Sequence, residues 1–126
     1  MRREWRPYWD WEDYDAGMYG LASDVANQTN AAVELLANPQ GLREAMTDAI
    51  EAWPKAAAHY LTDLASNRRA WVGQAACCHA LGIPAVVTKS AWWRLTEEQR
   101  DAANDAADIA IKQWEEVRGG AQTLFG

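Results

Sequence analysis

The sequence predicts an all-α domain of about six helices, the last of which is long. Alanine, the strongest helix former, recurs throughout the 126 residues, whereas the alternating valine, isoleucine and threonine pattern of strands is nearly absent. Apolar residues also repeat at intervals of three and four, which places them side by side on helical faces. The length is typical of one domain, so we expect residues 1–126 to fold as a single compact unit.

The first helical pattern runs from about residue 11 to Asn38. Its apolar stripe consists of Trp11, Tyr14, Met18, Leu21, Val25, Ala32 and Leu36. Gly17 and Gly20 disfavour a continuous helix, so we expect a break near Gly20, with Ser23 as the cap of the second piece. Asn38 followed by Pro39 has the form of a helix cap with proline in the first turn. The next stripe consists of Leu42, Met46, Ala49 and Trp53.

Proline and glycine divide the middle of the chain into short helices. Pro54 is expected to start a helix that reaches residue 64, and its inward residues are Ala57, Leu61 and Leu64. Asn67 is the expected cap of a helix over 68–81, which is apolar on nearly all sides after its two arginines and should therefore be buried. Gly82 closes this helix, and Pro84 begins another that reaches about residue 94. Its inner side carries Val87, Ala91 and either Trp92 or Trp93.

The last helix begins with a capping box, because Thr96 is followed three residues later by Gln99. We expect it to run to about Arg118 and to stop at Gly119. Its inner side consists of Ala103, Ala107, Ala110, Trp114 and Val117. Because most of these residues are alanines, a neighbouring helix can approach closely, and tryptophans are expected to fill the remaining volume.

The composition is acidic, with 12 lysines and arginines against 18 aspartates and glutamates and a formal net charge of −6. Phosphate backbones and anionic lipids repel such a chain, so direct nucleic-acid binding is not favoured. The apolar runs fall far short of the roughly 20 residues that span a membrane, and the amino-terminal residues MRREWRPYWDWED lack the apolar stretch of a secretory signal. We therefore expect a cytoplasmic protein.

The thiol and imidazole side chains gather at Cys77, Cys78 and His79. Successive side chains on a helix diverge by about 100°, so the two thiols cannot converge on one ion or substrate. A tetrahedral zinc site would lack ligands, since His59 is the other histidine of the chain. We expect both cysteines to be reduced core residues and His79 to lie at the rim, with no cofactor and no metal. The alternative is a small metal- or thiol-dependent enzyme that combines these residues with carboxylates.

The candidate binding surface lies in and just before PYWDWEDYDAGMYG, residues 7–20. Trp11, Tyr14 and Met18 follow the helical stripe and are assigned to the core. The candidate partner-binding residues are the aromatic and acidic side chains off that stripe: Trp5, Trp9, Asp10, Glu12, Asp13 and Asp15. Aromatic side chains beside acids are a common composition of protein-binding surfaces. The alternative for the acids is a solvated face near a helix start, where they favour the helix dipole.

Two groups of arginines are the exceptions in this acidic chain: Arg2, Arg3 and Arg6 at its start, and Arg68 and Arg69 near Trp71. Arginine beside an aromatic ring can hold single-stranded nucleic acid. Because the total charge is acidic and no helix-turn-helix pattern is present, we expect these arginines to form salt bridges with the protein's own carboxylates instead.

The second half of the chain contains two segments that form a recognisable pattern, NRRAWVGQAACCHALGIP (67–84) and AWWRLTEEQRDAANDAADIAIKQWEE (91–116). Together they resemble small uncharacterised proteins of phages and other mobile elements, in which an Asn-Arg-Arg/Lys-Ala-Trp helix with Gly-Gln-Ala-Ala precedes a Leu-Thr-x-x-Gln helix ending in Trp-Glu. The resemblance implies an accessory protein of such an element and supplies no catalytic residue. Small acidic proteins of that origin often block a host nuclease or defence complex, as anti-CRISPR proteins do.

These observations predict a non-enzymatic protein that binds a host protein or protein complex through its acidic, tryptophan-rich amino-terminal region, with the acidic final helix as a second contact. An acidic helical surface can occupy a basic nucleic-acid channel by electrostatic complementarity. A further alternative is a homo-oligomeric structural module, such as a homodimer, in which the aromatic stripe and the alanine face are buried against a second copy.

Overall fold

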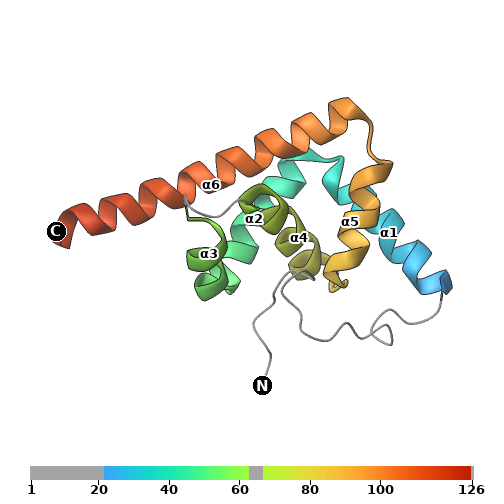
Figure 1. Ribbon diagram of the computed structural model, residues 1–126, viewed down its shortest axis with the longest axis horizontal. Helices are drawn as coiled ribbons and strands as arrows, with labels where there is room; N and C mark the ends of the chain where they lie inside the picture. The colour runs from blue at the N-terminus through green and yellow to red at the C-terminus, as the bar shows by residue number, and fades with distance from the viewer. Residues whose placement is uncertain (1–21, 63–66, 126) are drawn as a thin grey trace, which may run out of the picture.

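The computed structural model describes residues 22–62 and 67–125, with side chains described over 26–62 and 67–118. This part of the chain forms six α-helices and no strand (Figure 1). The helices are α1 (Ala22–Leu36), α2 (Pro39–Ala52), α3 (Pro54–Tyr60), α4 (Arg68–Leu81), α5 (Ala85–Arg94) and α6 (Glu97–Phe125). The prediction of an all-α domain with a long C-terminal helix is confirmed.

Three predicted helix caps are present with the expected geometry. The Asn38 side chain accepts a hydrogen bond from the backbone N–H of Gly41 at 3.3 Å, with proline next in the chain. At the end of α4, Gly82 adopts the left-handed conformation with a φ of 65°. The capping box of α6 is reciprocal, because Gln99 N–H donates to Thr96 Oγ1 at 3.1 Å and Thr96 N–H donates to Gln99 Oε1 at 2.9 Å.

Three other predicted boundaries, at Ser23, residue 64 and Gly119, are wrong, and the predicted cap at Asn67 is confirmed in position only. Ser23 lies inside α1 and is not its cap. Asn67 occupies the cap position of α4, but its side chain makes no capping hydrogen bond, because its backbone is not in the extended conformation that aims a cap side chain at the first turn. α3 ends at Tyr60, before the expected residue 64. Finally, α6 does not stop at Gly119 but continues to Phe125, since a helix can pass through glycine at a cost of about 1 kcal/mol.

α4 lies at the centre of the fold and packs against α1, α2, α5 and α6. Trp71 is fully buried there, and its ring stacks on that of Tyr60 with 5.7 Å between the ring centroids. The alanines of α6 that face α2 and α4 are at most 3% exposed: Ala103, Ala106, Ala107 and Ala110. These small side chains let the helices approach closely, and the predicted burial of α4 is confirmed.

Three other tryptophans pack against this core while keeping part of their surface exposed: Trp53, Trp92 and Trp114. Trp93 is 67% exposed, so Trp92 is the inward member of the adjacent pair. Ala57 and Leu61 are fully buried as predicted, whereas Leu64 lies outside the described residues.

α6 crosses the other helices, and its C-terminal part extends past the edge of the helical body (Figure 1). The last fully packed side chain on its inner side is that of Ile111, and Trp114 follows half-buried. Val117 is 76% exposed, so its predicted place on the inner side is wrong. The helical spacing is correct, but no element of the described structure lies opposite this turn.

Two glycines next to and within α4 make a matched pair for a stability test. A Cβ atom added at Gly73 meets no atom within 4 Å, whereas Gly82 has a positive φ. We expect Gly73→Ala to raise the free energy of unfolding by up to about 1 kcal/mol and Gly82→Ala to lower it by about 1 kcal/mol. Urea denaturation measures both changes, and shifts of the same sign in the two variants would contradict the assigned conformations.

Candidate functional site

The exposed side of α6 carries a row of carboxylates, which we call the acidic face: Glu98, Asp101, Asp105, Asp108 and Glu116. The row arises because alanines occupy the opposite, buried side of the helix. At a rise of 1.5 Å per residue it extends over about 27 Å. Lys112 and the partly exposed Ile109 lie in the same row. Acids in the first turn favour the helix dipole, whereas like charges four residues apart destabilise a helix by a few tenths of a kcal/mol per pair.

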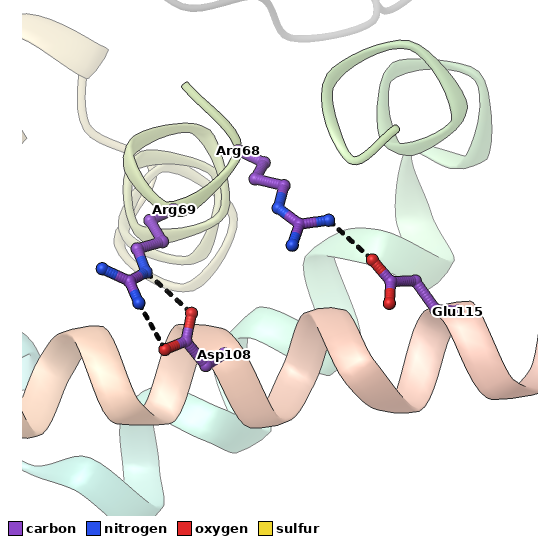
Figure 2. Close-up of polar contacts among 4 residues, drawn as sticks. All are labelled: Arg68, Arg69, Asp108 and Glu115. Atoms are coloured by element: carbon purple, nitrogen blue, oxygen red, sulfur yellow. Dashed lines mark hydrogen bonds and ion pairs between the residues drawn. The ribbon is translucent and has the colours of Figure 1, made fainter. Parts of the chain in front are cut away.

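Two arginines at the start of α4 pair with carboxylates of α6 (Figure 2). Arg69 donates from Nε and Nη2 to the two oxygens of Asp108 at 2.7 and 2.6 Å, a bidentate pair. Arg68 donates from Nη1 to Glu115 Oε1 at 2.6 Å. The hydrogen bond to Asp108 and the charge of that carboxylate raise the pKa of Arg69. The expected pairing with the protein's own carboxylates is therefore confirmed for Arg68 and Arg69, while Arg2, Arg3 and Arg6 lie outside the described residues.

The cysteines are core residues, as predicted. Cys77 is fully buried and Cys78 is 8% exposed, and neither forms a disulfide. Burial raises the pKa of the Cys77 thiol to about 12, and the adjacent Thr88 hydroxyl opposes part of this rise. His79 lies exposed at the rim, as expected, where its ring meets that of Trp53 edge to face at a centroid distance of 5.3 Å. Within the described residues, no group of three or more histidine, cysteine, aspartate or glutamate side chains is placed to hold a metal ion.

The candidate partner-binding residues of the amino-terminal region lie outside the described residues: Trp5, Trp9, Asp10, Glu12, Asp13 and Asp15. The same holds for Trp11, Tyr14 and Met18, which the helical spacing assigned to the core. The acidic final helix, expected as a second contact, has described side chains over residues 97–118, and its carboxylates are exposed apart from the partly buried Glu115.

A cavity of about 650 Å³ lies between α4, α5 and α6 and was not predicted. Buried apolar side chains of α1 and α2 line it: Leu36, Leu42 and Met46. Its other walls combine cationic, amide and indole side chains, among them Arg69, Lys89, Gln74, Asn104 and Trp92. One feature of the sequence could have indicated this cavity. A glycine and an amide, Gly73 and Gln74, interrupt the middle of an otherwise apolar helix.

Comparison of the chain with protein-family models, with curated proteins and with solved structures finds no match. Within the described residues, no single helix has the length and hydropathy to cross a membrane. α4 and α5 meet these criteria only when taken together, as a pair bent by 111°.

The bidentate pair between α4 and α6 should make a measurable contribution to stability. We expect a double-mutant cycle of Arg69→Ala and Asp108→Ala to give a coupling energy of about 0.5 to 1 kcal/mol, because both side chains remain about half exposed. The coupling should weaken at high salt. Arg69→Ala combined with Asp48→Ala, an exposed acid of α2, is the control and should be additive. Strict additivity of the first pair would contradict a stabilising contact.

The raised pKa of Cys77 predicts a specific loss of stability at alkaline pH. Above pH 9 the unfolded chain loses the thiol proton while the folded chain keeps it until about pH 12, so unfolding becomes more favourable between these values. At pH 10 this effect should lower the free energy of unfolding by about 1 kcal/mol. Urea denaturation at pH 8 and pH 10 should show a fall in the wild type larger by that amount than in Cys77→Ala. Equal falls would contradict a buried, protonated thiol.

Proposed function

We propose that the chain is a non-enzymatic accessory protein that binds a basic surface of a host protein or protein complex through the acidic face of α6. The observation that carries this proposal is the row of exposed carboxylates. Asp108 pairs with Arg69, but Glu98, Asp101, Asp105 and Glu116 form no ion pair with any described residue. Carboxylates that repel one another along a helix weaken it slightly in the free protein, and a basic partner would remove that cost.

The spacing of these charges supports a partner that normally binds nucleic acid. Along the helix axis the first four carboxylates of the acidic face follow one another at about 4.5 to 6 Å. A DNA strand carries one charge per about 3.4 Å, so the face presents a sparser line of negative charge. A basic channel built for a phosphate backbone would attract such a line by the same long-range field.

The sequence pattern of residues 67–84 and 91–116 supports an origin in a phage or mobile element, and with it a role as an inhibitor of a host nuclease or defence complex, similar to anti-CRISPR proteins. We propose the host cytoplasm as the place of action. We propose that the amino-terminal region forms a second contact with the same partner, because it combines aromatic side chains with acids. The residues proposed for this contact are Trp5, Trp9, Asp10, Glu12, Asp13 and Asp15.

Charge reversal on α6 tests this function. The variant Glu98→Lys/Asp101→Lys/Asp105→Lys should capture its partner from host lysate at least about tenfold less than the wild type, because three attractive charges become repulsive. The matched control is Glu44→Lys/Asp48→Lys/Glu51→Lys, which makes the same charge change on exposed positions of α2. It should retain capture. Quantitative mass spectrometry of the captured proteins is the measurement.

Equal losses of partner capture in the two triple variants would contradict a specific role for the acidic face. Such a result would show that capture depends only on the net charge of the protein. Absence of any captured protein would contradict the binding function itself. The variant Asp10→Lys/Glu12→Lys/Asp13→Lys separates the amino-terminal contact from α6, because undiminished capture by this variant would remove that contact from the proposal. Duplex DNA added as competitor should release a partner that is held through a nucleic-acid channel.

A further inference from the structure

We propose that the cavity between α4, α5 and α6 binds a small uncharged lactam, a flat molecule that carries an N–H donor and a carbonyl acceptor side by side on one edge. This site is separate from the protein-binding face proposed above and does not depend on it. A volume of about 650 Å³ is typical of small-molecule sites. Leu36, Leu42 and Met46 line the cavity and are each at most 1% exposed, so this part of its wall is apolar and belongs to the core.

The charged groups around the cavity already have partners within the protein. Arg69 pairs with Asp108, which also lines the cavity, and Arg68 pairs with Glu115 (Figure 2). Lys89, the third cationic residue of the described lining, has a partner as well. A charged ligand would lose its hydration without gaining an unpaired opposite charge from the described lining residues, and that exchange is unfavourable. The paired charges therefore favour an uncharged ligand.

The terminal amide of Gln74 is a polar group of this cavity that lacks partners. Gln74 lines the cavity and is 6% exposed, and its Oε1 atom is buried with no hydrogen-bond partner among the described residues. Its Nε2 atom also makes no hydrogen bond with a described residue. A glutamine amide accepts at its oxygen and donates from its nitrogen, and burying it without partners destabilises the folded chain. A ligand that supplies both partners would remove this loss.

A lactam edge is chemically complementary to this amide. The lactam N–H donates to Oε1 while the lactam carbonyl accepts from Nε2, so two hydrogen bonds join two planar groups. The last torsion of a glutamine side chain is broad, so the amide can turn both atoms toward the cavity without strain. The Thr88 hydroxyl also lines the cavity, but it lies against the Cys77 thiol and is not assigned to the ligand.

Space for a flat body is available in the same cavity. Gly73 precedes Gln74 on α4 and lines the cavity, and a Cβ atom added there meets no atom within 4 Å. Trp92 of α5 also lines the cavity and is half-buried against the core. Flat rings pack favourably against an indole. We assign this contact to Trp92, because the Arg100 guanidinium already lies over the Trp93 ring, 5.7 Å from its centroid.

The experiment is an NMR titration of the isotopically labelled full chain with three bicyclic probes. Carbostyril is a quinoline ring system with a lactam edge, quinoline lacks that edge, and quinaldate carries a carboxylate at the same position. We expect carbostyril to bind at one site with a Kd below about 1 mM and the other two probes to bind at least about tenfold more weakly. The side-chain amide signals of Gln74 should shift on binding of carbostyril.

Two variants separate the amide from the space beside it. Gln74→Leu removes an unpaired buried atom, so it should fold, and it should bind carbostyril and quinoline with equal affinity. Gly73→Leu places a side chain in the open space, and leucine is a better helix former than glycine, so this variant should fold and lose at least about tenfold in affinity for carbostyril. Lys112→Gln, exposed on α6 and outside the cavity lining, is the control and should bind as the wild type does.

Four results would overturn the proposal. The first is that carbostyril does not bind at about 1 mM. The second is a preference for carbostyril over quinoline that is absent in the wild type or survives in Gln74→Leu, since the amide would then not recognise the lactam. The third is tighter binding of quinaldate than of carbostyril, which would show recognition of charge. The fourth is an affinity that Gly73→Leu leaves unchanged, which would place the ligand elsewhere.

Partner capture from host lysate by Gln74→Leu should stay normal, because Gln74 is buried and does not belong to the acidic face. Failure of the lactam proposal is therefore distinguishable from failure of the protein-binding function.

Discussion

The rest of the structure depends on enclosing α4. Most of its circumference is apolar, and Trp71, Val72 and Ala75 have no exposed surface. Burying each large apolar side chain stabilises the fold by roughly 1.5 to 3 kcal/mol, so α4 is most stable when other helices pack against it on several sides. The helices that pack against α4 are α1, α2, α5 and α6. They come close enough because the contacting faces are rich in alanine, with Ala49 of α2 and Ala103 of α6 both nearly unexposed.

This arrangement also decides what the surface offers. Because α6 turns its alanines toward α2 and α4, its acids are left on the outside in one row. The arginines at the start of α4 then meet α6 from the side, where Asp108 and Glu115 are within reach (Figure 2). Where Gly73 and Ala107 face the same space, no bulky group fills the volume, and the cavity remains. The acidic face and the cavity thus both result from the way α6 packs on α2 and α4.

The proposed protein contact follows from the negative charge that α6 leaves on the outside. A basic protein surface would find a row of exposed carboxylates on α6. The buried thiol of Cys77 takes no part in this contact, because its side chain has no exposed surface and a pKa of about 12 keeps it protonated. Its neighbour His79 is engaged at the rim with the Trp53 ring.

The sequence by itself determined the helical class, most helix positions and the caps at Asn38, Gly82 and Thr96, since each cap depends on hydrogen bonds between residues three or four apart. It also determined that most of α4 is buried, because apolar residues occupy nearly all sides of this helix. Local rules failed at Gly119 and Val117, where the outcome depends on whether a partner element lies opposite the turn. Only the tertiary structure decided which arginine meets which acid, which of Trp92 and Trp93 turns inward, and where space is left unfilled. Those features join residues such as Arg69 and Asp108, 39 positions apart, and no local preference of the chain specifies them.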